Sequence, residues 1–343
     1  MSVNAPHPPA LAISFRGLLA LYLIVPLCWL LYAVDQRWFA GHLINNLPRT
    51  PEYFFILQII FGTPHIIASN LIMVGHADYW QYYRSKLMKM TVFLALVFGL
   101  GSVLLPYWVL YAVVALWTIL HVLKQQYGIA RGACRLPNSG FYALLTLSVL
   151  AGFLTYLGIF VDYRLPETYV GLLQTSIGVL CSALVLIAIW LSRTVTRPLA
   201  IGFLWVNPIM IVSSYLLYLE GYYLLAILAP RLIHDLTAYY VYLCHDFNRH
   251  HRHPDNRLYQ LAQSLRIPTL LVLPALSIAL ALVLQNYADA WLAWLSGNLF
   301  AHPVQKISSL GIIGYLALMH YYTEAFTWKH NSPYRRYLSF KLD

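Results

Sequence analysis

Residues 168–192 read TYVGLLQTSIGVLCSALVLIAIWLS, a continuous apolar run without a charged side chain. A helix that crosses a lipid bilayer needs about 20 such residues, so this run predicts one transmembrane span. Comparable runs occur at residues 10–34, 51–75, 88–105, 107–128, 140–160, 198–218, 222–246, 266–285 and 305–328. The sequence therefore predicts an all-α integral membrane protein, folded as a single bundle of about ten transmembrane helices (range about 8–10).

The composition supports this fold class. Of 343 residues, 60% are hydrophobic and only 10% are charged, whereas soluble domains carry about 25% charged residues. We expect residues 1–9 to form a disordered N-terminal tail, residues 10–330 the polytopic membrane domain and residues 331–343 a cytoplasmic C-terminal tail. Four scattered cysteines without a CxxC pair indicate neither a disulfide framework nor a thiolate metal site.

The net charge of +10 is distributed as membrane topology requires. Basic residues cluster after every second predicted span, and cytoplasmic loops carry such an excess of Lys and Arg. Both termini are therefore predicted to be cytoplasmic, in a bacterial-type inner (plasma) membrane. Contact with anionic membrane lipid is expected, and nucleic-acid binding is not. The clusters are Arg84/Lys86/Lys89, Arg131/Arg135, Arg193/Arg197, Arg249/Arg252/Arg257/Arg266 and Lys329/Arg335/Arg336/Lys341.

Histidines inside these spans are the strongest functional signal, because ionisable side chains at membrane depth are costly. At about 1.5 Å per residue, His65, His121, His234 and His320 all lie about 18–23 Å below the outer face. Ligands of one metal must reach one point from different helices, and a shared layer provides this. We therefore expect the four imidazole nitrogens to converge within about 2.0–2.2 Å of one metal.

Other residues are secondary candidates. His245 lies nearer the cytoplasmic end and is a ligand only if its helix tilts or unwinds there. Glu324 follows His320 by four residues, on the same helix face, where it can orient the imidazole or act as a ligand. Tyr127 belongs to the polar inner end of its span, and we take Glu324 and Tyr127 as candidate catalytic residues. The histidines expected at surfaces or interfaces are His7, His42, His76, His302 and His330.

Imidazole ligands without cysteine favour iron, copper or zinc, and four of them leave positions open at an octahedral iron. The leading hypothesis is a non-haem oxygenase that uses Fe(II), with dioxygen as co-substrate. Its lipid-facing surroundings imply a lipophilic, unsaturated small-molecule substrate. A redox partner is left open.

Several short motifs resemble the bacterial Brp/Blh family. They are Phe61-Gly62-Thr63-Pro64-His65, His121 at a helix end, His234 with the Cys244-His245-Asp246-Phe247-Asn248-Arg249-His250 stretch, and Met319-His320 followed by Glu324. That family consists of membrane-embedded, iron-dependent β-carotene 15,15′-dioxygenases that make retinal. The resemblance implies iron held by intramembrane histidines and a carotenoid-like substrate.

Two other function classes remain open. A di-iron lipid desaturase or hydroxylase would use the histidine-rich stretch of His245, His250, His251 and His253, and would hold two irons per chain. A haem- or metal-binding electron-transfer or transport protein would use the intramembrane histidines as axial ligands or relay points.

Overall fold

The computed structural model describes residues 10–47, 62–161, 166–252, 254, 256–301, 303, 311–329 and 331–341. The fold is all-α apart from a two-stranded sheet of β1 (Ile13–Ser14) and β2 (Phe340–Lys341). The chain forms two compact units. Unit 1 comprises Met1–Ile13, Ile56–Pro106 and Ala238–Lys341, and unit 2 comprises Ser14–Phe55, Tyr107–Thr237 and Leu342–Asp343.

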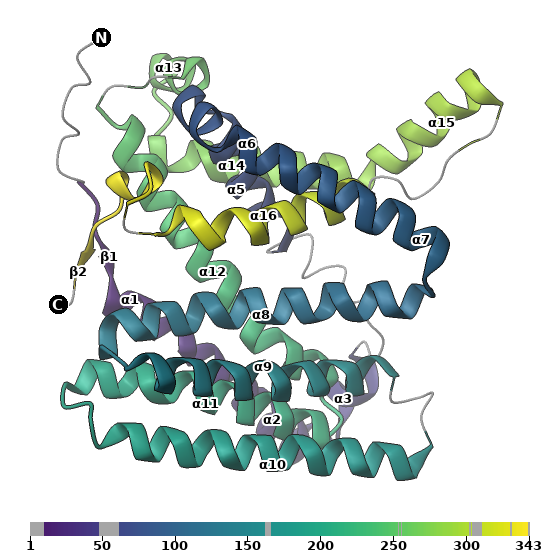
Figure 1. Cartoon of the computed structure of the whole chain (residues 1–343), viewed down its shortest axis with the longest axis vertical. Helices are drawn as coiled ribbons and strands as arrows, with labels where there is room; N and C mark the ends of the chain where they lie inside the picture. Colours follow the sequence, from purple (N-terminus) through teal and green to yellow (C-terminus); the bar gives the residue numbers. More distant parts are fainter. Residues whose placement is uncertain are drawn as a thin grey trace. The chain divides into compact units, whose positions relative to one another are not determined.

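Unit 2 is a layer of long helices. Helices α8, α9, α10 and α11 pack against one another and run side by side in Figure 1. These helices are long because each carries a continuous apolar run. The short loops between them place consecutive helices next to one another. The elements of this unit are α1 (Phe15–Ala20), the 3-10 helix η1 (Leu21–Leu23), α2 (Ile24–Trp38), α3 (His42–Asn46), α8 (Tyr107–Cys134), α9 (Asn138–Val161), α10 (Glu167–Ser192), α11 (Pro198–Leu219) and the first part of α12 (Tyr223–His250).

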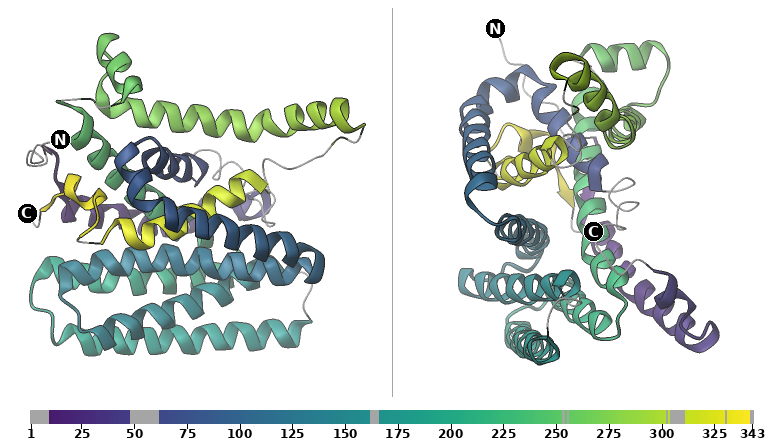
Figure 2. Two further views of the ribbon diagram at one scale, coloured as in Figure 1. Left: turned by 45° about the horizontal axis from the view of Figure 1, so that its top comes forward. Right: turned by 90° about the vertical axis from the view of Figure 1, so that its right-hand side faces the viewer.

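Unit 1 is built around the short helix α5 (Thr63–Val74), which packs against α14 and α16. Helix α15 follows α14 in nearly the same direction, as the left view of Figure 2 shows. The other elements are α6 (Ala77–Leu94), the π-helix η4 (Ala95–Leu100), α7 (Gly101–Leu104), the rest of α12, α13 (Arg257–Ser264), α14 (Thr269–Asn286), α15 (Ala288–Phe300), α16 (Ile313–Thr327) and the 3-10 helix η7 (Tyr334–Tyr337).

Six helices in the described part of the chain are long and apolar enough to cross a membrane. They are Phe15–Trp38, Trp108–Cys134, Asn138–Phe160, Glu167–Ser192, Pro198–Leu219 and Thr269–Asn286, and Thr63–Val74 is a shorter apolar helix. The predicted set of about ten spans is therefore reproduced in part. The predicted span 88–105 is split between α6, η4 and α7, and α6 carries Arg84, Lys86 and Lys89. Residues 51–61 and 304–310, which begin two other predicted spans, lie outside the described residues.

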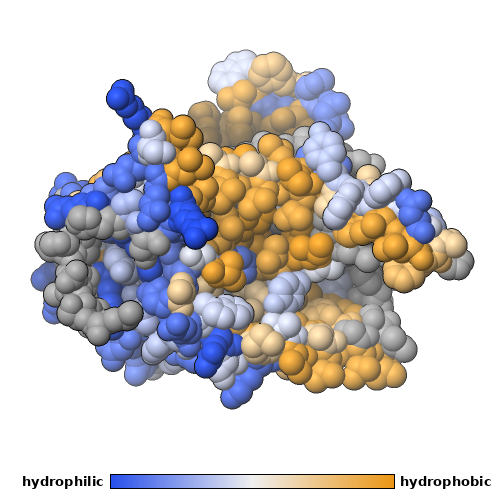
Figure 3. All heavy atoms as spheres, turned by 90° about the horizontal axis from the view of Figure 1, so that it is seen from above, coloured by the Kyte–Doolittle hydropathy of each residue, from blue (hydrophilic) through white to orange (hydrophobic). Residues whose placement is uncertain are grey.

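The outer surfaces of these helices are apolar. On α10, Leu172, Val179 and Leu186 are each about two-thirds exposed, and on α14 Leu271 and Val283 are about half exposed. Figure 3 shows hydrophobic residues gathered over a broad area of one face, with hydrophilic residues to its left. Exposed apolar area of this extent marks a surface that contacts lipid or another protein. With the lengths of the helices, it indicates insertion into a membrane.

The C-terminal segment 331–341 packs against the rest of unit 1. Tyr334 in η7 is 2% exposed, and the backbone N–H of Ile13 donates to the carbonyl of Ser339 at 2.7 Å. Asn248 of α12 donates to the carbonyls of Leu11 and Tyr337, each at 2.8 Å. These bonds hold both ends of the described chain to the end of α12. The expected disordered tail, residues 1–9, lies outside the described residues.

Candidate metal centre

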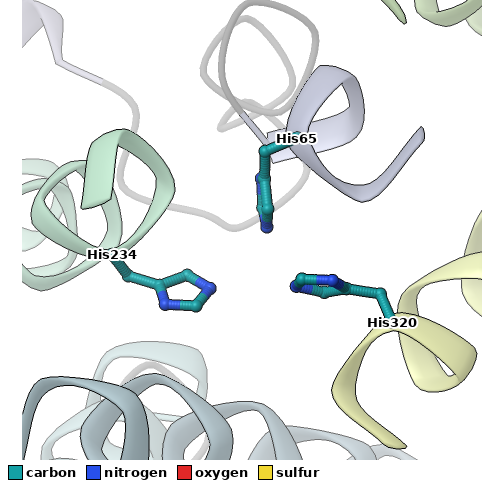
Figure 4. Close-up of side chains that lie close together, drawn as sticks. All are labelled: His65, His234 and His320. Atoms are coloured by element: carbon teal, nitrogen blue, oxygen red, sulfur yellow. The ribbon is translucent and has the colours of Figure 1, made fainter. Parts of the chain in front are cut away.

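The first pair of predicted ligands, His65 and His320, meets inside unit 1. His65 lies in the first turn of α5, directly after Pro64, which suits a first turn because proline lacks the N–H that would be unbonded there. The ring centroids are 4.9 Å apart at an interplanar angle of 79°, and their ligand nitrogens lie within 4.8 Å of each other. Figure 4 shows both rings directed into the same space; the third side chain labelled there, His234, belongs to unit 2.

Two hydrogen-bonded contacts hold α5 in place for this pair. The side-chain amide of Asn70 donates to the carbonyl of Leu316 on α16 at 3.1 Å, which joins the two helices that carry the histidines. Gln285 of α14 donates to the hydroxyl of Thr63, two residues before His65. Both imidazoles are almost completely buried, so they are presented by a packed frame.

The ring of His320 is oriented by a hydrogen-bonded chain. The Tyr242 hydroxyl donates to a carboxylate oxygen of Glu324, and Nδ1 of His320 lies 3.3 Å from the same hydroxyl. Because that hydroxyl proton goes to Glu324, Nδ1 of His320 is the donor in the second bond. The lone pair of the ring is then on Nε2. A histidine that donates from one nitrogen to such a partner is a typical metal ligand through the other.

The second pair, His121 and His234, meets inside unit 2. His121 lies on α8 and His234 on α12, with ring centroids 4.9 Å apart at an interplanar angle of 85°. Nδ1 of His234 lies 2.8 Å from the side-chain oxygen of Gln125, which is buried one turn after His121. An amide oxygen only accepts, so Nδ1 carries the proton and Nε2 again carries the lone pair.

The structure thus pairs the four predicted histidines two by two, with each pair formed from two different helices. Sequence reasoning missed the orienting roles of Tyr242 and Gln125. A signal for both was present: Tyr242 follows His234 by eight residues and Gln125 follows His121 by four, so each lies on the same helix face as a predicted ligand.

His245, the fifth predicted ligand, lies in an aromatic cluster of unit 1. Its ring stacks on Tyr334, with centroids 3.9 Å apart and an angle of 8°, and its Nε2 lies 2.8 Å from the Tyr79 hydroxyl. Burial raises the pKa of the Tyr334 hydroxyl well above its usual range, so that ring is neutral. These contacts give His245 a packing role between α12, α6 and the C-terminal segment.

Tyr127, a predicted catalytic residue, is buried in unit 2. Its hydroxyl lies 2.8 Å from the hydroxyl of Ser148, which joins α8 to α9. A buried hydroxyl needs such a partner, and the bond ties together two helices of the layer.

A second histidine group appears where the sequence predicted surface or loop residues. His76, expected at a surface or interface, is 5% exposed, and with Asp246 and His250 it forms a group whose ligand atoms lie within 4.8 Å of one another. All three belong to unit 1. His251 stacks instead on Phe247 and is partly exposed, and His253, His302 and His330 lie outside the described residues.

Comparison of the chain with protein-family models, with curated proteins and with solved structures finds no match. The function is therefore inferred from the arrangement of these side chains.

Proposed function

We propose that this chain is an integral-membrane, non-haem iron oxygenase that acts on a lipophilic unsaturated substrate. In this proposal the iron ligands are the buried histidines of each unit, His65 with His320 in unit 1 and His121 with His234 in unit 2. Glu324 orients His320 through Tyr242. The resemblance to the Brp/Blh motifs suggests a carotenoid-like substrate.

The observation that carries the proposal is the pair of orienting contacts. Glu324 and Tyr242 set the tautomer of His320, and Gln125 sets that of His234. In both cases Nδ1 is the donor and Nε2 carries the lone pair. Ring orientation by a partner of the non-ligating nitrogen is characteristic of metal-binding histidines, and it appears in each unit beside a second buried imidazole.

The donor set suits iron. Imidazole with carboxylate nearby is typical of non-haem Fe(II) sites, whereas thiolate would favour zinc or copper(I). The four cysteines of the chain, Cys28, Cys134, Cys181 and Cys244, are buried and carry no disulfide, and no group of candidate metal ligands in the described residues includes one. Bound iron would supply the redox chemistry with dioxygen. The residues of the chain supply buried donors, fixed tautomers and an apolar environment that excludes water.

The geometry of both pairs disfavours haem. Two axial imidazoles on opposite sides of a haem iron place their ring centroids about 6 Å apart, since each metal–nitrogen bond is about 2.0 Å. The centroid distances of 4.9 Å in both pairs are shorter, and the rings meet edge to face. Ligation of one non-haem ion by neighbouring imidazoles fits this spacing better than a porphyrin between them.

The oxygen balance separates the leading proposal from the di-iron desaturase or hydroxylase. Cleaving a carbon–carbon double bond with one dioxygen molecule gives two carbonyl groups and uses both oxygen atoms, so no external electron donor is required. Desaturation or hydroxylation reduces at least one oxygen atom to water and requires two electrons from a redox partner. Oxygen-18 incorporation into the products therefore distinguishes the two reactions.

The test uses the full chain purified in detergent, with iron quantified by mass spectrometry and turnover of β-carotene followed under oxygen-18. We expect the four variants His65→Ala, His121→Ala, His234→Ala and His320→Ala each to lose bound iron and turnover. His42→Ala is the matched control, because His42 is exposed on α3 and should leave both unchanged.

Two results would contradict the proposal in different ways. Full iron content in all four variants would exclude these histidines as ligands. An electron-donor requirement with oxygen-18 in only one product atom would favour the hydroxylase.

A further inference from the structure

A buried group of two histidines and one carboxylate in unit 1 stands apart from the residues used above. His76 precedes α6 as its N-cap residue, and Asp246 and His250 lie one turn apart on α12. Their exposed fractions are 5%, 2% and 2%, and their ligand atoms lie within 4.8 Å of one another. Such donors at such distances can be bridged by one ion, because metal–nitrogen and metal–oxygen bonds are about 2.0–2.2 Å long.

Neighbouring side chains hold these donors in position. The Tyr259 hydroxyl lies 2.6 Å from each oxygen of Asp246, and the ring of Tyr259 stacks on His250 with centroids 3.8 Å apart. The ring of His76 lies 5.0 Å from that of His250. A hydroxyl has one proton and serves one carboxylate oxygen at a time, so the carboxylate retains capacity for a cation. Tyr259 thus orients two of the three donors at once.

Arg249 fixes the end of α12 next to this group. Its guanidinium bonds both oxygens of Asp78 on α6, at 2.8 and 3.2 Å, and lies over the ring of Tyr79 at 4.7 Å. Because His76 lies immediately before α6, the same contacts set its position relative to Asp246 and His250. The three donors are therefore held by a rigid junction of two helices.

A cavity of about 90 Å³ adjoins the group. His76, Asp246 and Tyr259 line it, together with Asn256 and apolar residues such as Leu273. Three protein ligands plus a small open space is the arrangement of zinc sites that keep a fourth position for water or a small ligand.

We infer that His76, Asp246 and His250 form a second metal site, separate from the intramembrane histidines, that binds a divalent transition ion of the Zn²⁺ class. Its fourth position faces the cavity and takes water or a small anion. The alternative, a purely hydrogen-bonded network of the same residues, binds no metal. The inference does not depend on the proposed oxygenase function.

The test is a Zn²⁺ titration of chelator-treated full chain in detergent, in a His65→Ala/His320→Ala background that removes one intramembrane pair. We expect one tight Zn²⁺ equivalent to remain, and His250→Ala or His76→Ala added to this background to weaken it at least 100-fold. Co²⁺ in place of Zn²⁺ should give visible absorption bands of the bound ion that the same changes abolish. His251→Ala, at the next position of the chain, is the matched control and should retain the equivalent.

Further variants keep the result interpretable if a histidine change disturbs folding. Asp246→Asn preserves the shape of the side chain and should remove Zn²⁺ binding, and Tyr259→Phe should weaken it about 10–100-fold by releasing the carboxylate. Absence of a tight Zn²⁺ equivalent in the background protein, or an undiminished one in His250→Ala and Asp246→Asn, would overturn the inference. An unchanged iron content in the His65→Ala variant would contradict the oxygenase proposal, but it would not affect the inference of a second metal site.

Discussion

At the scale of single residues, the orienting contacts matter more than the histidines alone. Any buried imidazole needs a hydrogen-bond partner, so burial of His320 or His234 by itself indicates little. The informative feature is that each has its partner at Nδ1, which leaves Nε2 as the lone-pair nitrogen. An imidazole in this tautomer can bind a metal ion through Nε2.

The role of Tyr242 yields a prediction at this scale. Tyr242→Phe removes the hydroxyl that links Glu324 to His320 and should lower iron affinity about 10–100-fold, with His65 and His320 still present. Competition with a graded chelator measures the affinity.

Tyr239→Phe is the matched control for that change. It removes another hydroxyl of α12, which lies 2.5 Å from the Ser277 hydroxyl on α14. Equal iron affinity in wild type, Tyr242→Phe and Tyr239→Phe would mean that the Glu324–Tyr242 contact is structural only.

At the scale of elements, small residues set how closely the helices of unit 2 approach. A Cβ added to Gly158 on α9 would lie 2.6 Å from the hydroxyl oxygen of Tyr218 and 2.7 Å from its ring. Such a contact forces a shift of a buried aromatic side chain. A Cβ on Gly152 of the same helix would meet its nearest neighbour, Ile119, at 3.4 Å, an ordinary contact.

The two glycines therefore give opposite predictions. Gly158→Ala should destabilise the protein by about 1–3 kcal/mol through overpacking. Gly152→Ala should be neutral or stabilising by up to about 1 kcal/mol, because alanine restricts the unfolded chain and favours helix. Thermal unfolding of both variants in the same detergent measures the difference. A lower melting temperature for Gly152→Ala than for Gly158→Ala would refute this account of α9 packing.

At the scale of the whole molecule, the charge pattern predicts an orientation in the membrane. Helix α10 is long enough to span a bilayer and runs from Glu167 to the basic loop of Arg193 and Arg197. From the distribution of Lys and Arg, we expect the basic end of α10 to be cytoplasmic.

Cysteine labelling from outside the cell tests this orientation. Thr168 and Thr196 are exposed and lie at opposite ends of α10, and the four native cysteines are buried. A membrane-impermeant maleimide should label Thr168→Cys in intact bacteria, and Thr196→Cys only after the membrane is permeabilised. The reverse pattern would show that the topology is inverted.

Sequence patterns predicted the all-α class and most of the long apolar helices, because length and hydropathy along one helix are local properties. They predicted one span at residues 88–105, which the structure divides between α6, η4 and α7, and α6 carries Arg84, Lys86 and Lys89. They also identified His65, His121, His234 and His320 as buried. A histidine within an apolar span faces the protein interior, because exposure of its imidazole to lipid is costly.

Only the tertiary structure decided which residues face each other. The pairing of His65 with His320, the Tyr242 link to Glu324 and the burial of His76 beside Asp246 and His250 join positions far apart in the chain. No periodicity within a single helix records such contacts, because they depend on how helices rotate and pack. The sequence by itself determined where polar groups enter an apolar interior; packing determined which of them meet, and so which can share a metal.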